Sequence, residues 1–177
     1  MPALRLFALL LAFVPGPAVA QGQVLLEAAL ARALDTFEQA LPALAPEEMG
    51  VDVGQYREAL TWNRFASTYW GGAVRLDIAT QPEAGGSCSR FAAFVEIPPR
   101  DGAVRLVLCP QFFTPGADAL RELTVLHEMV HVVAGPDECR AMAFAARVQM
   151  AATGTFTPVD LYWRASSCAG SEFRLPK

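Results

Sequence analysis

Apolar residues in the first part of the chain have the spacing of a helix. Between residues 24 and 41 they recur every three or four positions, which predicts an amphipathic helix that Pro42 and Pro46 would end. A second helix is predicted from about Asp52, a suitable N-cap, toward Tyr69, before a Gly-Gly pair. Four aromatic residues of this stretch are expected in the core, with a cleft lining as the alternative: Trp62, Phe65, Tyr69 and Trp70.

The pattern then changes to one typical of strands. Residues 73–79 alternate between apolar and polar, and residues 91–97 and 104–108 are rich in β-forming residues. The turn sequence PPRDG, residues 98–102, separates the last two segments. It predicts that they form a β-hairpin, with the prolines at the ends of the strands.

Two more helices are predicted after the hairpin. The first begins near Asp118, a candidate N-cap, and ends at Gly135-Pro136. The second covers residues 138 to about 152, with Asp137 as its cap and a glycine after it. The tail from residue 155 has no regular period. The apolar face of the first of these helices is expected to contain four residues: Leu120, Leu123, Leu126 and Val130.

Together these patterns predict an α+β fold. About three strands would form a small mixed sheet packed on the helix that begins near Asp118, with helices before the sheet and one further helix after it. No repeat or low-complexity segment interrupts residues 21–177, so this part of the chain is expected to be a single domain.

The first 20 residues have a different character from the rest. Arg5 is followed by an apolar run, two prolines and the sequence Ala18-Val19-Ala20. This pattern is typical of a cleaved secretory signal peptide, so residues 1–20 are expected to be removed and the protein to act in the periplasm or outside the cell. An uncleaved anchor is the alternative, but the apolar run from Leu6 to Val14 is too short for a bilayer that needs about 20 residues.

Charge argues against two classes of partner. The chain has a formal net charge of −4, and the part after residue 20 contains neither a basic run nor another apolar stretch long enough to span a membrane. Binding to nucleic acid and stable insertion into a membrane are therefore not expected.

The four cysteines all lie in the part expected to be exported, where disulfides are stable. Of the three possible pairings, we favour Cys88–Cys109 and Cys139–Cys168. The first pair flanks the predicted hairpin, and the second would tie the tail to the segment that precedes the last helix. A zinc site made of cysteines is the alternative, but no CxxC spacing supports it.

The only two histidines of the chain belong to the sequence HEMVH. His127 and His131 lie four residues apart, with Glu128 directly after the first. On a helix this spacing puts both imidazoles on one face, where they can bind one zinc ion. Glu128 faces about 100° away around the helix axis, so it is placed to take a proton from a water molecule that zinc activates.

The alternative is that these three residues are ordinary core or surface groups. Their neighbours in the sequence are apolar nearly all round the predicted helix, so the helix is expected to be buried. Buried imidazole and carboxylate groups need partners, and a metal ion would supply them.

A third metal ligand is expected just after the turn that follows the motif. Catalytic zinc sites usually have three protein ligands and one open position. Asp137 and Glu138 both lie near His131 in such an arrangement, but Asp137 is expected to use its side chain as the N-cap. Glu138 is therefore favoured over Asp137, and Cys139 is expected to be bridged.

The motif resembles that of a known group of enzymes. HEMVH matches the HExxH signature of the zincin metallopeptidases, and the layout of residues 104–150 resembles the deuterolysin-like aspzincins, with a hairpin ending near LCPQFF, the motif helix and a glycine-led turn. When GPDECRAM is laid on the GTxDxxYG motif of that family, Glu138 takes the place of its Asp ligand and Ala141 that of its Tyr. A minimal gluzincin-like family with a glutamate ligand fits equally well.

The resemblance implies a zincin-like fold, a Zn²⁺ cofactor and hydrolysis of peptide bonds in a peptide or protein substrate, with Glu128 as general base. It also implies that strand 104–108 is the sheet edge along which the substrate lies. Because the family's tyrosine is missing from its place, Tyr162, Arg140 and Arg164 are candidates for stabilising the transition state. A non-catalytic, disulfide-stapled binding domain and a zinc hydrolase of non-peptide substrates remain as alternative functions.

Overall fold

The computed structural model describes residues 17–177, and residues 1–16 of the predicted signal peptide lie outside that range. The remaining residues of that predicted peptide, 17–20, belong to the first helix. The helices are α1 (Pro17–Ala40), α2 (Val53–Trp62), α3 (Asp118–Ala134), α4 (Glu138–Thr153) and α5 (Asp160–Ala165). The strands are β1 (Glu47–Glu48), β2 (Val51–Asp52), β3 (Arg64–Ser67), β4 (Gly72–Thr80), β5 (Ala93–Arg100) and β6 (Ala103–Leu108).

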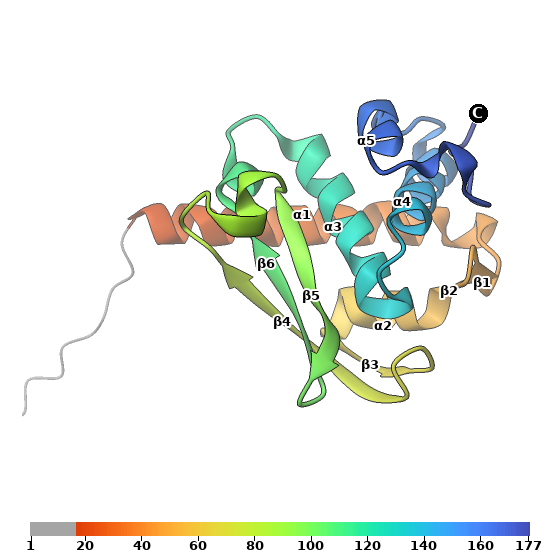
Figure 1. Ribbon diagram of the computed structural model, residues 1–177, viewed down its shortest axis with the longest axis horizontal. Coiled ribbons are helices and arrows are strands. Elements are labelled where there is room, and N and C mark those ends of the chain that lie inside the picture. Colours follow the sequence, from red (N-terminus) through yellow and green to blue (C-terminus); the bar gives the residue numbers. More distant parts are fainter. Residues whose placement is uncertain (1–16) are drawn as a thin grey trace, which may run out of the picture.

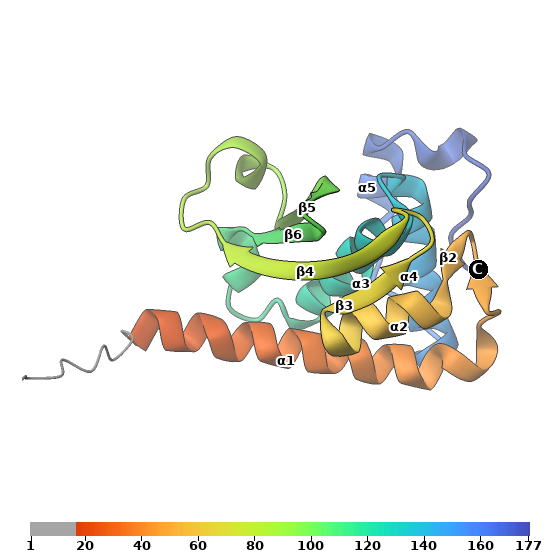
Figure 2. The same ribbon diagram turned by 90° about the horizontal axis from the view of Figure 1, so that it is seen from below.

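Helix α3 lies at the centre of the molecule. It contacts α1, α2 and α4 as well as strand β5. Figure 2 shows α1 along one side of the molecule and the strands β4, β5 and β6 on the other. Because α3 is covered on nearly every side, all of its residues from Val125 to Ala134 are buried. The expected α+β fold is thus confirmed, with the HEMVH sequence on its most buried helix.

The first helix agrees with the apolar spacing, whereas the second ends earlier than expected. Asp52 caps α2 as expected, because its carboxylate accepts a hydrogen bond from the backbone N–H of Gln55 at 2.9 Å. The helix ends at Trp62 because Asn63 adopts a left-handed conformation with φ of 53°. Residues 64–67 then form strand β3, so the prediction of a helix up to Tyr69 is wrong beyond Trp62.

The main sheet has four strands in the order β3-β4-β6-β5, one more than expected. Strands β4 and β6 are parallel and the other pairs are antiparallel, so the sheet is mixed. The predicted hairpin is confirmed, with Asp101 and Gly102 forming its turn at φ of 49° and 70°. Pro98 and Pro99 lie within β5, where the pairing register shifts between Glu96 and Arg100.

The predicted position of the sheet edge is wrong. Strand β6, which contains residues 104–108, pairs with β5 on one side and with β4 on the other. The edge beside α3 is instead β5, as Figure 1 shows. The parallel pairing of β4 with β6 joins strands that are distant in the sequence, and this pairing is what covers the second side of β6.

The start of α3 also differs from expectation. Asp118 is the first helical residue rather than the cap, because Ala117 takes the N-cap position. The Asp118 carboxylate pairs with Arg121 in the same helix and with Arg32 of α1. Leu120, expected on the buried face, is 49% exposed, whereas Leu123, Leu126 and Val130 are buried as expected.

Both predicted disulfides are present. Cys88 is bonded to Cys109 and Cys139 to Cys168, so no cysteine is free to bind zinc. Disulfides are consistent with a place outside the cytoplasm. The second bridge ties the start of α4 to the tail, in which the short helix α5 was not expected from the sequence.

Among residues 17–177, no helix has the length and apolar character needed to cross a membrane.

Candidate metal centre

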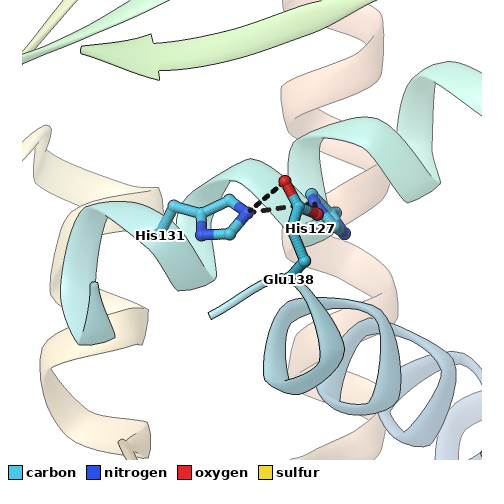
Figure 3. Close-up of side chains that lie close together, drawn as sticks. All are labelled: His127, His131 and Glu138. Carbon is cyan, nitrogen blue, oxygen red and sulfur yellow. Dashed lines mark hydrogen bonds and ion pairs between the residues drawn. The ribbon is translucent and has the colours of Figure 1, made fainter. Parts of the chain in front are cut away.

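Three side chains meet where α3 and the first turn of α4 face each other. His127 and His131, one turn apart on α3, point their Nε2 atoms toward each other at 3.1 Å. The Glu138 carboxylate, from the first turn of α4, lies 3.2 Å from His127 Nε2 and 3.7 Å from His131 Nε2 (Figure 3). One ligand atom from each residue lies within 4.8 Å of the others, so these three residues can hold a metal ion.

The spacing of these atoms fits a small tetrahedral ion. Two ligand atoms that are each about 2.0–2.1 Å from such an ion lie roughly 3.3–3.4 Å apart. The distances of 3.1, 3.2 and 3.7 Å among the two Nε2 atoms and the carboxylate oxygens are close to that value. Little rearrangement would therefore be needed to bring all three side chains onto one ion.

The turn after α3 orients one of the histidines. Gly135 has φ of 86°, and its carbonyl oxygen lies 2.9 Å from Nδ1 of His131. A carbonyl can only accept a hydrogen bond, so Nδ1 must carry the proton and Nε2 of His131 is left as the possible ligand atom when the ring is neutral. The same turn reverses the chain so that Glu138 faces the two histidines.

Asp137 and Glu138 have separate tasks at the start of α4. The Asp137 carboxylate accepts a hydrogen bond from the backbone N–H of Arg140 at 2.9 Å, as a helix cap does. Its side chain is thereby committed to the backbone, and it does not belong to the group of ligand atoms. The structure brings Glu138 to the histidines and leaves Asp137 outside.

The charges of the site influence one another strongly. Burial raises the pKa of Glu138, but hydrogen bonds and positive charge from His127 and His131 outweigh burial and hold that pKa well below its usual range. Burial lowers the pKa of His131, but its hydrogen bond to Glu138, the charge of Glu128 and the Gly135 carbonyl together raise it. The cluster thus favours a negatively charged carboxylate facing the imidazoles, which suits a cation.

Glu128 is a buried carboxylate next to the possible ligands. Burial raises its pKa, and the negative charge of Glu138 adds to this effect, while His127 and His131 oppose it. Among the described residues, no hydrogen bond to its carboxylate contributes to the pKa. Such a group is able to accept a proton near neutral pH more readily than an exposed glutamate.

Two cavities open onto this carboxylate. The larger, of about 420 Å³, reaches His127 and Glu128, and the smaller, of about 200 Å³, reaches Glu128, His131 and Glu138. Both are also lined by Phe91, which precedes β5, by Ala93, the first residue of β5, and by Tyr162 of α5. The three possible ligands therefore lie between two open spaces beside the sheet edge.

Of the three candidates for stabilising a transition state, the structure brings only Tyr162 to the cluster. Its hydroxyl donates a hydrogen bond to Glu138 at 3.2 Å, and burial together with Glu138 raises its pKa. The guanidinium of Arg140 instead donates to the carbonyl of Ala134 at 2.8 Å. Arg164 is exposed on α5 and lines neither cavity.

Of the four aromatic residues expected in the core, only Phe65 is buried, and Trp62 is 69% exposed. The other two contact the end of α3 and the turn that follows it. Trp70, in the loop between β3 and β4, donates a hydrogen bond from its indole N–H to the carbonyl of Val132 at 2.7 Å, in the last turn of α3. Tyr69 lies directly against Gly135. Trp70 is half-buried and Tyr69 is 50% exposed. No local pattern could have paired this loop with the turn, because the contact joins segments more than 60 residues apart.

The contact between Tyr69 and Gly135 predicts a measurable difference between two glycines. A Cβ at Gly135 would overlap the Tyr69 ring and hydroxyl, whereas a Cβ at Gly154, which also has a positive φ, would meet nothing within 4 Å. Gly154→Ala should therefore lower the free energy of unfolding by about 1 kcal/mol through backbone strain alone. Gly135 combines φ of 86° with ψ of −167°, a region open almost only to glycine, whereas Gly154 is in the left-handed helical region. Gly135→Ala should therefore lower the free energy of unfolding by about 3 kcal/mol, because larger backbone strain is added to the overlap with Tyr69. Urea denaturation of both variants measures the difference, and equal losses would contradict the close contact.

Comparison with known proteins does not add to this picture: no family model, curated protein or solved structure matches the chain.

Proposed function

We propose that the chain is a zinc-dependent metallopeptidase of the zincin type, which acts outside the cytoplasm after residues 1–20 are removed. His127, His131 and Glu138 are its zinc ligands and Glu128 is its general base. The observation that carries this proposal is the convergence of three ligand atoms beside a buried carboxylate that is open to two cavities.

The set of ligands supports zinc and a catalytic site. Two imidazole nitrogens and one carboxylate are a ligand set typical of catalytic zinc, whereas structural zinc sites are usually closed by four protein ligands. The two cavities leave room for a water molecule and a substrate beside the three side chains. Zinc bound here would supply a Lewis acid that polarises a carbonyl group and lowers the pKa of water.

Glu128 moves the proton in the proposed reaction. Its raised pKa brings it closer to working pH, where a carboxylate can take a proton from the attacking water and later give it to the leaving amine. Glu128 lines both cavities, so a substrate that occupied both would pass beside its carboxylate. Because the three proposed ligands would hold the zinc ion, the Glu128 carboxylate would remain free to move this proton.

Strand β5 offers an edge for the peptide. It is the last strand of its sheet, and residues 93–97 have backbone groups that can pair with an added strand. Pro98 and Pro99 lack a backbone N–H, so pairing along this edge is limited at that end. The usable part of the edge coincides with the cavities, because Ala93 lines both of them and Val95 and Ile97 line the smaller one.

Tyr162 is the donor that we assign to the transition state. Its hydroxyl faces the possible ligands, where negative charge would develop on the substrate oxygen. At saturating zinc, Tyr162→Phe should lower kcat by about 100- to 1000-fold, the usual loss for one such donor. Because the variant also loses the hydrogen bond to Glu138, its zinc affinity should fall by no more than about 10- to 100-fold. Steady-state kinetics beside a zinc assay measures this effect. An unchanged kcat would exclude Tyr162 from this role.

The proposal as a whole is tested by cleavage of peptides. The chain from Gln21, purified with its disulfides intact and loaded with zinc, should cleave peptides in a mixture that mass spectrometry resolves. A chelator should stop the cleavage and added zinc should restore it. If no peptide bond is cleaved under conditions in which zinc is bound, the function as a peptidase is excluded.

A further inference from the structure

The larger cavity beside the proposed catalytic residues is apolar over most of its wall. His127, Glu128 and Tyr162 lie at one part of it. Strand β5 and its preceding residues, α3, α4 and the tail after α4 supply the remainder. Six large apolar side chains from these segments line it: Phe91, Leu120, Leu123, Met142, Val159 and Leu161.

The charged residues of this cavity do not create a preference for one sign. Besides His127 and Glu128, the charged side chains in its lining are Arg90 and Asp160, which are opposite in charge. A substrate side chain entering from the site would therefore meet mainly hydrocarbon. The volume of about 420 Å³ lies in the range typical of ligand pockets, about 300–1000 Å³.

Two leucines at this cavity are unusually exposed. Leu120 on α3 is 49% exposed and Leu161 on α5 is 83% exposed, and both are among the few large apolar residues left open to solvent in the described chain. They lie on different segments that border the same cavity. An apolar group seated between them would remove hydrocarbon surface from water.

We propose that this cavity binds a large aliphatic or aromatic side chain of the peptide substrate next to the bond that is cleaved, and that the tail after α4 forms the wall that selects it. This inference rests on the proposed function and names the substrate class. The lining of the cavity includes His127 and Glu128, so the cavity opens directly onto the proposed site of cleavage. A substrate side chain next to the cleaved bond would therefore enter it.

The tail forms this wall as a tethered segment. Residues 158–162 line the cavity and include the start of α5, which is only six residues long. The disulfide from Cys139 to Cys168 ties the tail to the start of α4, beside Glu138. Hydrogen bonds from Tyr162 to Glu138 and from Thr157 to Gln149 hold it on the same side. The Cys139–Cys168 disulfide thus holds the tail, which forms the selecting wall, next to the possible metal ligand Glu138.

Small hydroxamates test the cavity without requiring turnover. The zinc-loaded chain from Gln21 is titrated with the hydroxamates of leucine, phenylalanine, alanine and aspartic acid, in which the hydroxamate group binds zinc and the side chain is free to enter the cavity. We expect the leucine and phenylalanine compounds to bind at least about 10-fold more tightly than the other two, as burial of a large apolar side chain requires. Equal affinities for all four would overturn the inference and leave the zinc site intact. If none of the four binds, both the open zinc site and the inference are overturned.

A substitution in the tail tests the wall itself. Leu161→Asp changes an exposed residue, so the fold and melting temperature should be unaffected. It should reduce the preference for phenylalanine over alanine, in hydroxamate affinity and in kcat/KM for matched peptides, by about 10-fold or more. The matched control is Val24→Asp on α1, which is 63% exposed and lines neither cavity of the site. A preference that is unchanged in Leu161→Asp would exclude the tail as the selecting wall.

Discussion

Replacing Glu128 by glutamine should abolish most peptide hydrolysis while zinc stays bound. Glutamine has nearly the same shape as glutamate, but its amide cannot take a proton from water at working pH. Loss of a general base typically costs about 100- to 10 000-fold in rate. Because Glu128 is not among the three possible ligands, the zinc content should not change.

The experiment compares kcat/KM and zinc content in the parent, Glu128→Gln and a control. Glu58→Gln is a suitable control, because Glu58 is an exposed glutamate on α2 and lines neither cavity of the site. The control should match the parent in both measurements. Hydrolysis that survives in Glu128→Gln would contradict the assignment of the base. Loss of zinc in that variant would mean that Glu128 holds the metal site together instead.

The second large effect is expected on zinc affinity. His131→Ala should weaken zinc binding by more than about 100-fold, since even the loss of an outer hydrogen bond to a ligand typically costs about 10- to 100-fold. Removal of one of three ligands leaves an incomplete site. Competition with a chelating dye, beside elemental analysis after dialysis, measures the change.

A second variant separates loss of a ligand from loss of the fold. His131 is buried, so alanine at this position also creates a cavity. The Glu138 side chain is 41% exposed, and Glu138→Gln keeps its size while removing the charge. It should therefore weaken zinc binding strongly, with a smaller loss of melting temperature than His131→Ala because no cavity is created. Unchanged affinity in Glu138→Gln would remove Glu138 from the ligand set.

The local chemistry of the site could be predicted from the sequence. The spacing of His127 and His131 determines that both lie on one face of a helix, whatever surrounds it. The capping role of Asp137 follows from its place before a helix, and it leaves Glu138 as the residue that reaches the histidines. The two disulfides could be inferred because the segments they join were already placed near each other.

Features that depend on long-range pairing could not be predicted in this way. The sequence shows that residues 104–108 form a strand, but the parallel pairing with β4 that makes β6 internal is not visible in it. The early end of α2 depends on the left-handed conformation of Asn63, which few residues adopt and which no apolar period reveals. The place of Tyr162 depends on a short helix in a tail without a regular pattern.

Anomalous diffraction at the zinc edge, from crystals of the zinc-loaded chain, tests the central claim most directly. The account predicts one strong peak between α3 and α4, about 2.0–2.2 Å from Nε2 of His127, from Nε2 of His131 and from a carboxylate oxygen of Glu138. The peak should be absent from crystals of His131→Ala prepared in the same way. No peak at this position in the parent, or a peak held by other residues, would contradict the proposed zinc site and the function built on it.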